Sequence, residues 1–190
     1  STVATAILGE QGYQVSGVML RLWETEAELL VNSTKYSQAF QDAANVCKYL
    51  GIPFYFYDVK DKFHEWVIVN FIDGYLSGIT PNPCIVCNRK IKWGSLLDYS
   101  LNIGADYLAT GHYARTLVSS DGKVQLLRGI DESKDQAYML STLSQEQLSR
   151  TLFPLGNMLK SDVRKKAIEL KLHVVDREES QDLCFLAGED

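Results

Sequence analysis

Short apolar segments alternate with segments of helical pattern along this chain, and this alternation restricts its fold more than any other feature. The segments expected to be strands, residues 13–23, 52–59, 105–111 and 173–176, are apolar or rich in β-formers along most of their length. Strands that are apolar on both faces are typical of a parallel sheet that helices cover on both sides. The sequence therefore predicts an α/β fold, built as a doubly wound, mostly parallel sheet with helices on both faces.

The segments between these strands have the spacing of amphipathic helices. Ser120, Asp121 and Gly122 predict the turn of a small β-hairpin in residues 112–130. One helix, which covers residues 134–152, is expected to break near Ser144. The remaining helices are expected over residues 1–12, 35–51, 61–78, 88–104 and 160–172.

Composition narrows the class of protein. A chain of 190 residues with 46% hydrophobic and 23% charged residues is typical of one soluble globular domain. No apolar run approaches the ~20 residues of a membrane span, so no membrane association is expected. Four cysteines are few for a secreted disulfide scaffold, which favours a cytoplasmic protein with free thiols. The net charge of −5 neither indicates nor excludes binding to nucleic acid, because the local field decides that.

Folds of this class bind ligands beyond the carboxyl ends of their strands. Three loops leave expected strands in that direction, after Leu22, after Val59, and at residues 110–112. In the third loop Gly111 permits a close backbone approach, and His112 is either a ligand contact or a surface residue. Farther along, the run Lys134, Asp135 and Gln136 begins an expected helix, which is a favourable place for an anion.

The stretch TPNPCIVCNRKIKWG, residues 80–94, concentrates thiols, prolines and positive charge. A zinc site is one interpretation of Cys84 and Cys87, but zinc needs four ligands and Cys47 is expected in the core. A redox pair is a second interpretation, although no thioredoxin-like order of elements surrounds it. The third is a reactive thiolate at Cys87, with Asn88 as the N-cap of a helix whose first turn is basic.

A fourth cysteine lies near the end of the chain, in the stretch SQDLCF. Cys184 is followed by apolar residues, and a buried core cysteine is its ordinary interpretation. A second reactive thiol becomes attractive there only because Cys87 needs a partner for exchange chemistry.

Taken together, the motifs resemble the tRNA-specific 2-thiouridylases, or tRNA-uridine 2-sulfurtransferases, which are PP-loop ATP pyrophosphatases. TPNPCIVCN, IKWGSLLDYSLNIGADYLATGHYAR, LLRGIDESKDQAYML, LFPLGNMLKSDVRKKA and SQDLCF occur in that family's order. The resemblance implies that Cys87 is the catalytic nucleophile and Cys184 the persulfide carrier. It places Asn82, Pro83 and Cys84 at the target base. It further assigns tRNA contacts to His112, Lys134, Asp135 and Gln136, and ATP-site positions to Ser1, Leu20 and Gly111.

The resemblance also implies a reaction. ATP with Mg²⁺ adenylates the C2 carbonyl oxygen of the wobble uridine, a cysteine persulfide delivers sulfur, and a second cysteine releases the product through a disulfide. The expected partners are tRNA and a sulfur donor, either a cysteine desulfurase or a sulfur-relay protein. Residues 1–190 are expected to form part of the catalytic domain. Ser1 would be the last residue of the family's phosphate loop, and the later β-rich tRNA-binding domains lie outside this stretch.

One departure from the family leaves a second mechanism open. Family members often have Asp where this chain has Cys84. Three cysteines, Cys84, Cys87 and Cys184, are therefore candidate ligands of an iron–sulfur cluster, which thiolates commonly bind. Two competing hypotheses assign the chain a different function. One is a PP-loop synthetase that adenylates a small carboxylate or carbonyl compound, and the second is a non-catalytic module that binds metal or RNA.

Overall fold

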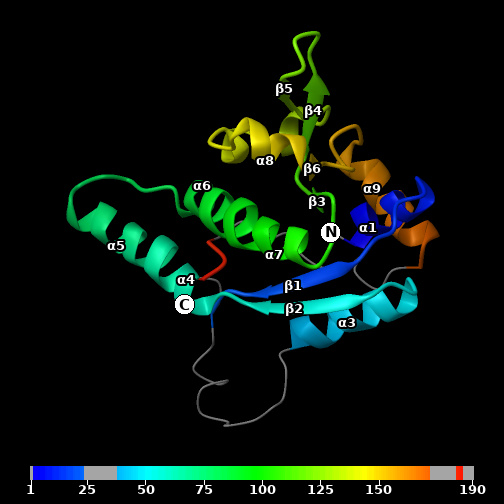
Figure 1. Cartoon of the computed structure of the whole chain (residues 1–190), viewed down its shortest axis with the longest axis horizontal. Helices are drawn as coiled ribbons and strands as arrows, with labels where there is room; N and C mark the ends of the chain where they lie inside the picture. Colours follow the sequence, from blue (N-terminus) through cyan, green and yellow to red (C-terminus); the bar gives the residue numbers. More distant parts are fainter. Residues whose placement is uncertain (1, 24–37, 172–182, 186–190) are drawn as a thin grey trace.

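The computed structural model describes residues 2–23, 38–171 and 183–185 (Figure 1). In chain order its elements are α1 (Thr2–Glu10), β1 (Gly17–Arg21), α3 (Gln38–Tyr49), β2 (Phe54–Asp58), α4 (Lys60–Phe63), η1 (His64–Ile68), α5 (Val69–Leu76), α6 (Pro83–Val86), η2 (Cys87–Leu96), α7 (Leu97–Asn102), β3 (Leu108–Ala109), β4 (Ala114–Val118), β5 (Val124–Arg128), η3 (Glu132–Lys134), η4 (Ala137–Leu140), α8 (Gln145–Ser149), β6 (Thr151–Leu152) and α9 (Lys160–Glu169). The elements η1 and η2 are π-helical, and η3 and η4 are 3₁₀-helical.

The first layer is the parallel pair β1–β2, in which Gly17 lies opposite Phe54 and Arg21 opposite Asp58. Helix α3 covers one face of this pair (Figure 1). Its Phe40 ring makes an edge contact with Phe54, at 5.2 Å between ring centroids. A Cβ at position 17 would collide with Cys47 of α3. Glycine at this position therefore lets the helix pack directly on the strand.

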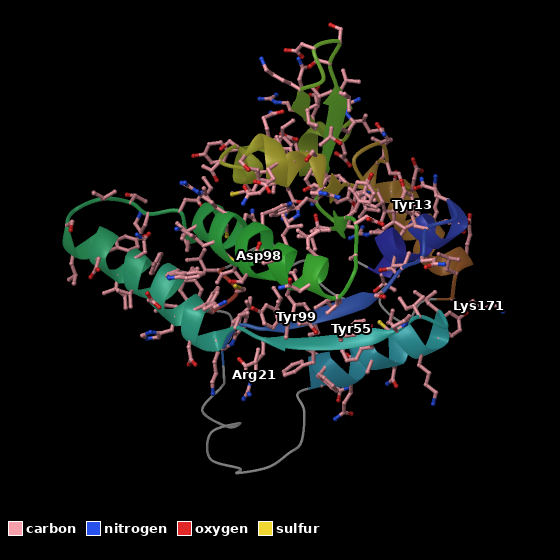
Figure 2. All side chains as sticks on the ribbon, viewed as in Figure 1. Tyr13, Arg21, Tyr55, Asp98, Tyr99 and Lys171 are labelled. Atoms are coloured by element: carbon pink, nitrogen blue, oxygen red, sulfur yellow. The ribbon has the colours of Figure 1, made fainter. Side chains whose placement is uncertain are left out.

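The other face of β1–β2 is covered by the continuous helix formed by α6, η2 and α7. Leu96 and Leu97 belong to the main core, and Leu20 of β1 packs against it. Tyr57 of β2 and Tyr99 of α7 stack with their ring centroids 4.4 Å apart, and Tyr99 lies between the helix and the strands in Figure 2. The prediction of an α/β fold with helices on both faces is therefore confirmed.

The middle of the chain adds a second parallel pair and a hairpin. β3 pairs with β6 in parallel, while β4 and β5 form the expected antiparallel hairpin. In the described ranges these strands are not hydrogen-bonded to β1–β2. The main core joins them instead, because Leu108 of β3 belongs to the same cluster against which Val18 of β1 packs.

Two expectations for residues 134–152 are corrected. The first half is 3₁₀-helical rather than α-helical, because backbone and side-chain bonds from Gln136 to Tyr113 and from Ala137 to Asp135 constrain it. The second correction is that the helix stops at Ser149 and residues 151–152 form strand β6. The break near Ser144 is confirmed, since Ser144 caps α8 in a capping box with Gln147.

The first helix, α1, packs against the last helix, α9. Helices α1 and α9 share a small core that contains Val3, Ala4 and Val163, and the Lys166 ammonium lies 2.8 Å from a Glu10 carboxylate oxygen. The strand expected at residues 173–176 lies outside the described residues. No helix in the described part of the chain is long and apolar enough to cross a membrane.

Candidate functional site

The candidate site forms at the carboxyl ends of β1 and β2, as the fold class predicts. The strands end at Arg21 and Asp58, and the next residues, Leu22 and Val59, enter a core cluster around Cys87. This cluster, hereafter the thiol core, consists of Val59, Phe63, Val67, Cys87 and Ile91, with Leu20, Leu22, Tyr57, Trp66, Ile68, Val86 and Phe185 packed against it. The loops expected to carry ligand contacts after Leu22 and Val59 therefore adjoin Cys87.

The helix that carries Cys84 and Cys87 begins earlier than the sequence suggested. Asn82 is extended, with φ −112° and ψ 93°, and its side-chain oxygen accepts a hydrogen bond from the Ile85 N–H at 3.2 Å. Pro83 occupies the first helical position, where its missing N–H costs nothing. The prediction that Asn88 caps the helix is therefore wrong. Asn88 is buried in the second turn and donates a hydrogen bond to the Met139 carbonyl oxygen at 2.9 Å.

From Cys87 to Leu96 this helix is π-helical. A π-helix joins residues i and i+5, whereas an α-helix joins i and i+4. Within this segment Lys92 is near enough to act on the pKa of Cys87, while Ile91 packs with Cys87 in the thiol core. Segments of this kind are frequent at functional sites, and here the segment turns a cation toward a thiol.

The Cys87 thiol is buried, with 8% of its surface exposed. The pKa of this thiol is raised to about 11, chiefly by burial with smaller contributions from Cys184 and Cys84, and Lys92 acts in the opposite direction. The expectation of a thiolate favoured by a helix N-terminus is therefore corrected. Desolvation outweighs the nearby cation, so Cys87 is a neutral thiol at physiological pH.

Cys184 approaches the same place from the end of the chain. The residue after it, Phe185, makes edge contacts with Phe63 and Phe71, with centroid distances of 5.9 and 5.4 Å. The segment 183–185, red in Figure 1, accordingly lies beside α4 and α6. Cys184 is exposed, yet neighbouring chain desolvates it enough to raise its pKa, and Cys84 adds to that effect while Lys92 opposes it.

His112 closes the site on the side of β3. Its Nδ1 lies 2.8 Å from Thr110 Oγ1, and its ring centroid lies 5.6 Å from Trp93 and 6.4 Å from Phe153. Burial lowers the pKa of His112 to about 3, and Lys92 lowers it further. The imidazole is thus neutral and partly buried among aromatic rings, and the hydrogen bond with Thr110 holds its Nδ1 edge in place.

The other residues assigned to tRNA lie in a loop held by backbone contacts. Gln136 accepts a hydrogen bond from the Tyr113 N–H at 3.1 Å. Asp135 accepts one from the Gly129 N–H at 2.9 Å, and its second carboxylate oxygen lies 3.8 Å from Arg128 Nε. Lys134 ends the 3₁₀ turn η3. These contacts order the loop beside His112, so the sequence-predicted contacts from 112 to 136 share one side of the site.

The structure brings the three cysteines of the predicted site together, because Cys87 and Cys184 each interact electrostatically with Cys84. All four cysteines of the chain are free, and Cys47 is buried as expected. Leu20 lies on β1 and Gly111 in the loop after β3. Ser1 lies outside the described residues. Within residues 2–23, 38–171 and 183–185, no three His, Cys, Asp or Glu side chains form a group that could hold a metal ion.

The sequence grouped Lys92 with Arg89 and Lys90 as one basic turn beside a Cys87 thiolate, and did not distinguish Lys92 from its two neighbours. In the structure its charge acts on Cys87, Cys184 and His112. These groups belong to three separate parts of the chain. No signal in the sequence marks the π-helical register that separates Lys92 from its neighbours.

Comparison with known proteins identifies the family. A family model described as the tRNA methyl transferase HUP domain matches residues 1–188. The chain belongs to this family. Membership of the HUP domain family agrees with the α/β architecture, and the resemblance to 2-thiouridylases drawn from the motifs is confirmed.

Relatives of this HUP domain carry a more specific name. The chain is 47% identical over 196 residues to a tRNA-specific 2-thiouridylase MnmA from Natranaerobius thermophilus, covering 100% of this chain and 53% of the relative. It is 46% identical over 191 residues to a protein of the same name from Chloroflexus aurantiacus, with the same coverage of 100% and 53%. A Staphylococcus aureus relative of that name is 41% identical over 186 residues, covering 98% of this chain and 50% of the relative. The chain thus spans about half the length of the curated relatives it matches.

Proposed function

We propose that the protein is a tRNA-uridine 2-sulfurtransferase that replaces the C2 oxygen of the wobble uridine with sulfur. The observation that carries this proposal is the convergence of Cys84, Cys87 and Cys184 at the carboxyl ends of a parallel sheet, with Lys92 beside them. Sulfur transfer needs two thiols, one to carry the sulfur and one to resolve the intermediate. The names of the relatives support the same activity.

The thiols divide the work according to their environments. Cys184 is exposed on a segment near the chain end, which suits it to receive a sulfur atom as a persulfide from a donor protein. The terminal persulfide sulfur attacks C2 of the activated uridine, and the adenylated oxygen departs with AMP. Cys87 then attacks the Cys184 sulfur, which leaves a Cys87–Cys184 disulfide and the 2-thiouridine. Two electrons from an external thiol reduce the disulfide before the next cycle.

The neutral state of Cys87 fits the second of these roles. A resolving thiol is needed only after the carbon–sulfur bond has formed. Its high pKa limits premature reaction with the persulfide. Lys92 supplies the positive charge that stabilises the thiolate when Cys87 loses its proton.

Activation of the uridine would come from ATP, which supplies AMP as the leaving group on the carbonyl oxygen. Gly111 follows β3 at the carboxyl end of its strand, where the backbone can approach a nucleotide. Among the described residues no group of three or more His, Cys, Asp or Glu side chains could hold a metal ion, so we derive no step from Mg²⁺ or from an iron–sulfur cluster.

The expected tRNA contacts surround these thiols. Asn82, Pro83 and Cys84 form the start of the helix that carries Cys87, where Cys84 is exposed, Asn82 is partly buried and Pro83 is buried. His112 and the loop Lys134, Asp135 and Gln136 lie on the opposite side, connected through Tyr113. A flipped uridine between these two sides would place its C2 atom near the thiols.

Three single substitutions in the full-length protein test this division of work. Cys184→Ser should abolish persulfide loading. Cys87→Ser should load sulfur yet release no thiouridine, and Cys84→Ser should be the mildest change. Persulfide labelling, iron content and tRNA thiolation would be measured on anaerobic protein, with Cys47→Ala as the control for a buried thiol outside the site. Equal loss of activity and iron in all three variants would contradict the persulfide route and support a cluster.

A further inference from the structure

A cavity lies against the helix that carries Cys84 and Cys87. It is a cavity of about 450 Å³ between η1–α5 on one wall and α6–η2 on the other. Trp66 and Asn70 line the first wall, and Arg89 and Lys90 line the second, with Thr142 between them. The volume is in the range of small-molecule sites, so the cavity suits one small group rather than a helix.

Trp66 gives this cavity an aromatic surface, and two lysine side chains lie over its rings. The Nζ atoms of Lys62 and Lys90 each lie 5.9 Å from the centroid of the Trp66 rings. An aromatic face stacks on any nucleobase, and neighbouring cations bind the phosphate of the same nucleotide. Arg89 adds a planar donor that binds phosphate through two hydrogen bonds. The arrangement therefore has the parts of a nucleotide site.

The charge of the lining argues for a single nucleotide. Arg89 and Lys90 are offset by Glu65 and Asp73, which also line the cavity. A site for a triphosphate or for a duplex backbone would carry an excess of cations. A balanced lining instead tolerates one phosphate, while carboxylate oxygens can accept hydrogen bonds from the amino and imino groups of a base.

The position of the cavity connects it to the thiols. Ile85 and Val86 line it and directly follow Cys84 on the helix. Trp66 and Val86 also pack against the thiol core, so the cavity and the core share a wall. Arg89 lies five positions after Cys84, which is roughly 7.5 Å at the α-helical rise. That separation is within the reach of the nucleotide next to one bound at Cys84.

We propose that this cavity binds a nucleotide adjacent to the target uridine in single-stranded RNA, with its base stacked on Trp66 and its phosphate on Arg89 and Lys90. This inference rests on the proposed function, because it extends the RNA path from Cys84 along the same helix. The η1–α5 wall would then hold the anticodon loop in one position. That position determines which uridine reaches the thiols.

The test uses the full-length protein and an anticodon stem-loop RNA, with a second set of RNAs that lack one base next to the target uridine. Trp66→Ala should weaken binding of the intact RNA about 5- to 150-fold, the range for loss of one base stack. The same substitution should have little effect on the RNA that lacks the stacked base. Trp66→Phe retains an aromatic face and should bind within about threefold of the parent protein.

Two control variants separate the cavity from its surroundings. Tyr75→Ala removes an exposed aromatic ring of the same helix outside the cavity and should leave RNA affinity unchanged. Arg89→Ala should lower the slope of log affinity against log salt by about one, whereas Lys165→Ala on α9 should not.

Each outcome decides the inference. Equal affinity of the intact RNA for Trp66→Ala and for the parent protein would overturn it. It would also be overturned if Trp66→Ala lowered the affinity for every abasic RNA by the same factor. If sulfur transfer from the donor protein falls in Trp66→Ala while RNA affinity is unchanged, the cavity receives a protein and the inference is wrong. Thiolation by the parent protein reports on the proposed function separately, so a protein that thiolates tRNA without using Trp66 would contradict only the cavity.

Discussion

At the scale of single residues, the site works through the opposition of burial and charge at Cys87. The surrounding apolar side chains raise the pKa of the thiol, and Lys92 lowers it. Because Lys92 also acts on Cys184 and His112, one ammonium group influences three functional candidates. Replacing Lys92 should therefore change the reactivity of the thiols more than replacing any other lysine on this helix.

Lys92→Met should slow alkylation of Cys87 by iodoacetamide about tenfold at pH 8, the effect of a one-unit rise in pKa. The reason is that the thiolate fraction falls when the cation that lowers the pKa of this thiol is removed. Mass spectrometry of the Cys87 peptide gives the rate. Lys90→Met is the matched control, because Lys90 lies over Trp66 instead and should leave the rate almost unchanged. Equal slowing in both variants would contradict the π-helical register argued here.

His112 should make the stability of the fold depend on pH. Its pKa is about 3 in the folded chain and about 6.5 when unfolded, so below pH 6.5 the unfolded state binds a proton that the folded state does not. The contribution is therefore complete above pH 6.5 and is lost as the pH falls toward 3. Between pH 7 and 5 the parent protein should lose about 2 kcal/mol more than His112→Gln, measured by urea unfolding. The same loss in both proteins would mean that His112 is protonated while folded.

The sequence predicted which side chains meet at the site better than it predicted their state. Motif order was sufficient to bring Cys87 and Cys184 together. The protonation of Cys87 was predicted wrongly, because the basic run Arg89, Lys90 and Lys92 suggested a thiolate. The burial of Cys87 depends on Phe63 and Phe185, which come from distant parts of the chain. Local sequence carries no measure of that desolvation.

At the scale of elements, alternation and capping residues predicted most helices and strands. The errors have specific physical causes. Asn88 seemed the better cap because it precedes a basic turn, but Pro83 fits the first helical position and lets Asn82 cap the helix. Strand β6 was missed because two residues carry no periodicity. Its position depends on distant hydrogen bonds, such as the 2.6 Å bond from Trp93 Nε1 to Thr151 Oγ1.

The connection between β6 and α9 depends on a glycine for close packing. Any Cβ at Gly156 would collide with the carbonyl oxygen of Ala114, at the start of β4. Gly156→Ala should therefore destabilise the protein by about 1–3 kcal/mol in urea unfolding, because backbone must move. Gly9→Ala in α1 is the control, since nothing lies within 4 Å of its Cβ position, and it should stabilise by about 0.5–1 kcal/mol. Equal effects of the two changes would show that close approach at Gly156 is unimportant.

At the scale of the whole molecule, the candidate site joins segments that are far apart in sequence. Strands β1 and β2 provide its base, the α6–η2 helix provides Cys84 and Cys87, and residues 183–185 return to the same cluster. The α/β class was predictable because apolar strands require cover on both faces. The sequence did not predict how the two parallel pairs associate. In the described ranges they are joined by side chains of the main core and not by hydrogen bonds between the pairs.

This return of the chain predicts that oxidation will stabilise the fold. Mild oxidation with diamide should form a disulfide between Cys87 and Cys184, since Cys184 is near enough to raise the pKa of Cys87. The bond would close a loop of about 100 residues and restrict the unfolded chain, which should raise the free energy of unfolding by about 2–4 kcal/mol. Urea unfolding before and after reduction measures the difference, and peptide mass spectrometry identifies the bond. Cys184→Ser should show no such difference. A bond that joins Cys47, or an oxidised protein no more stable than the reduced one, would mean that Cys184 does not reach Cys87 in solution. In that case the second step proposed for sulfur transfer would lack its resolving thiol.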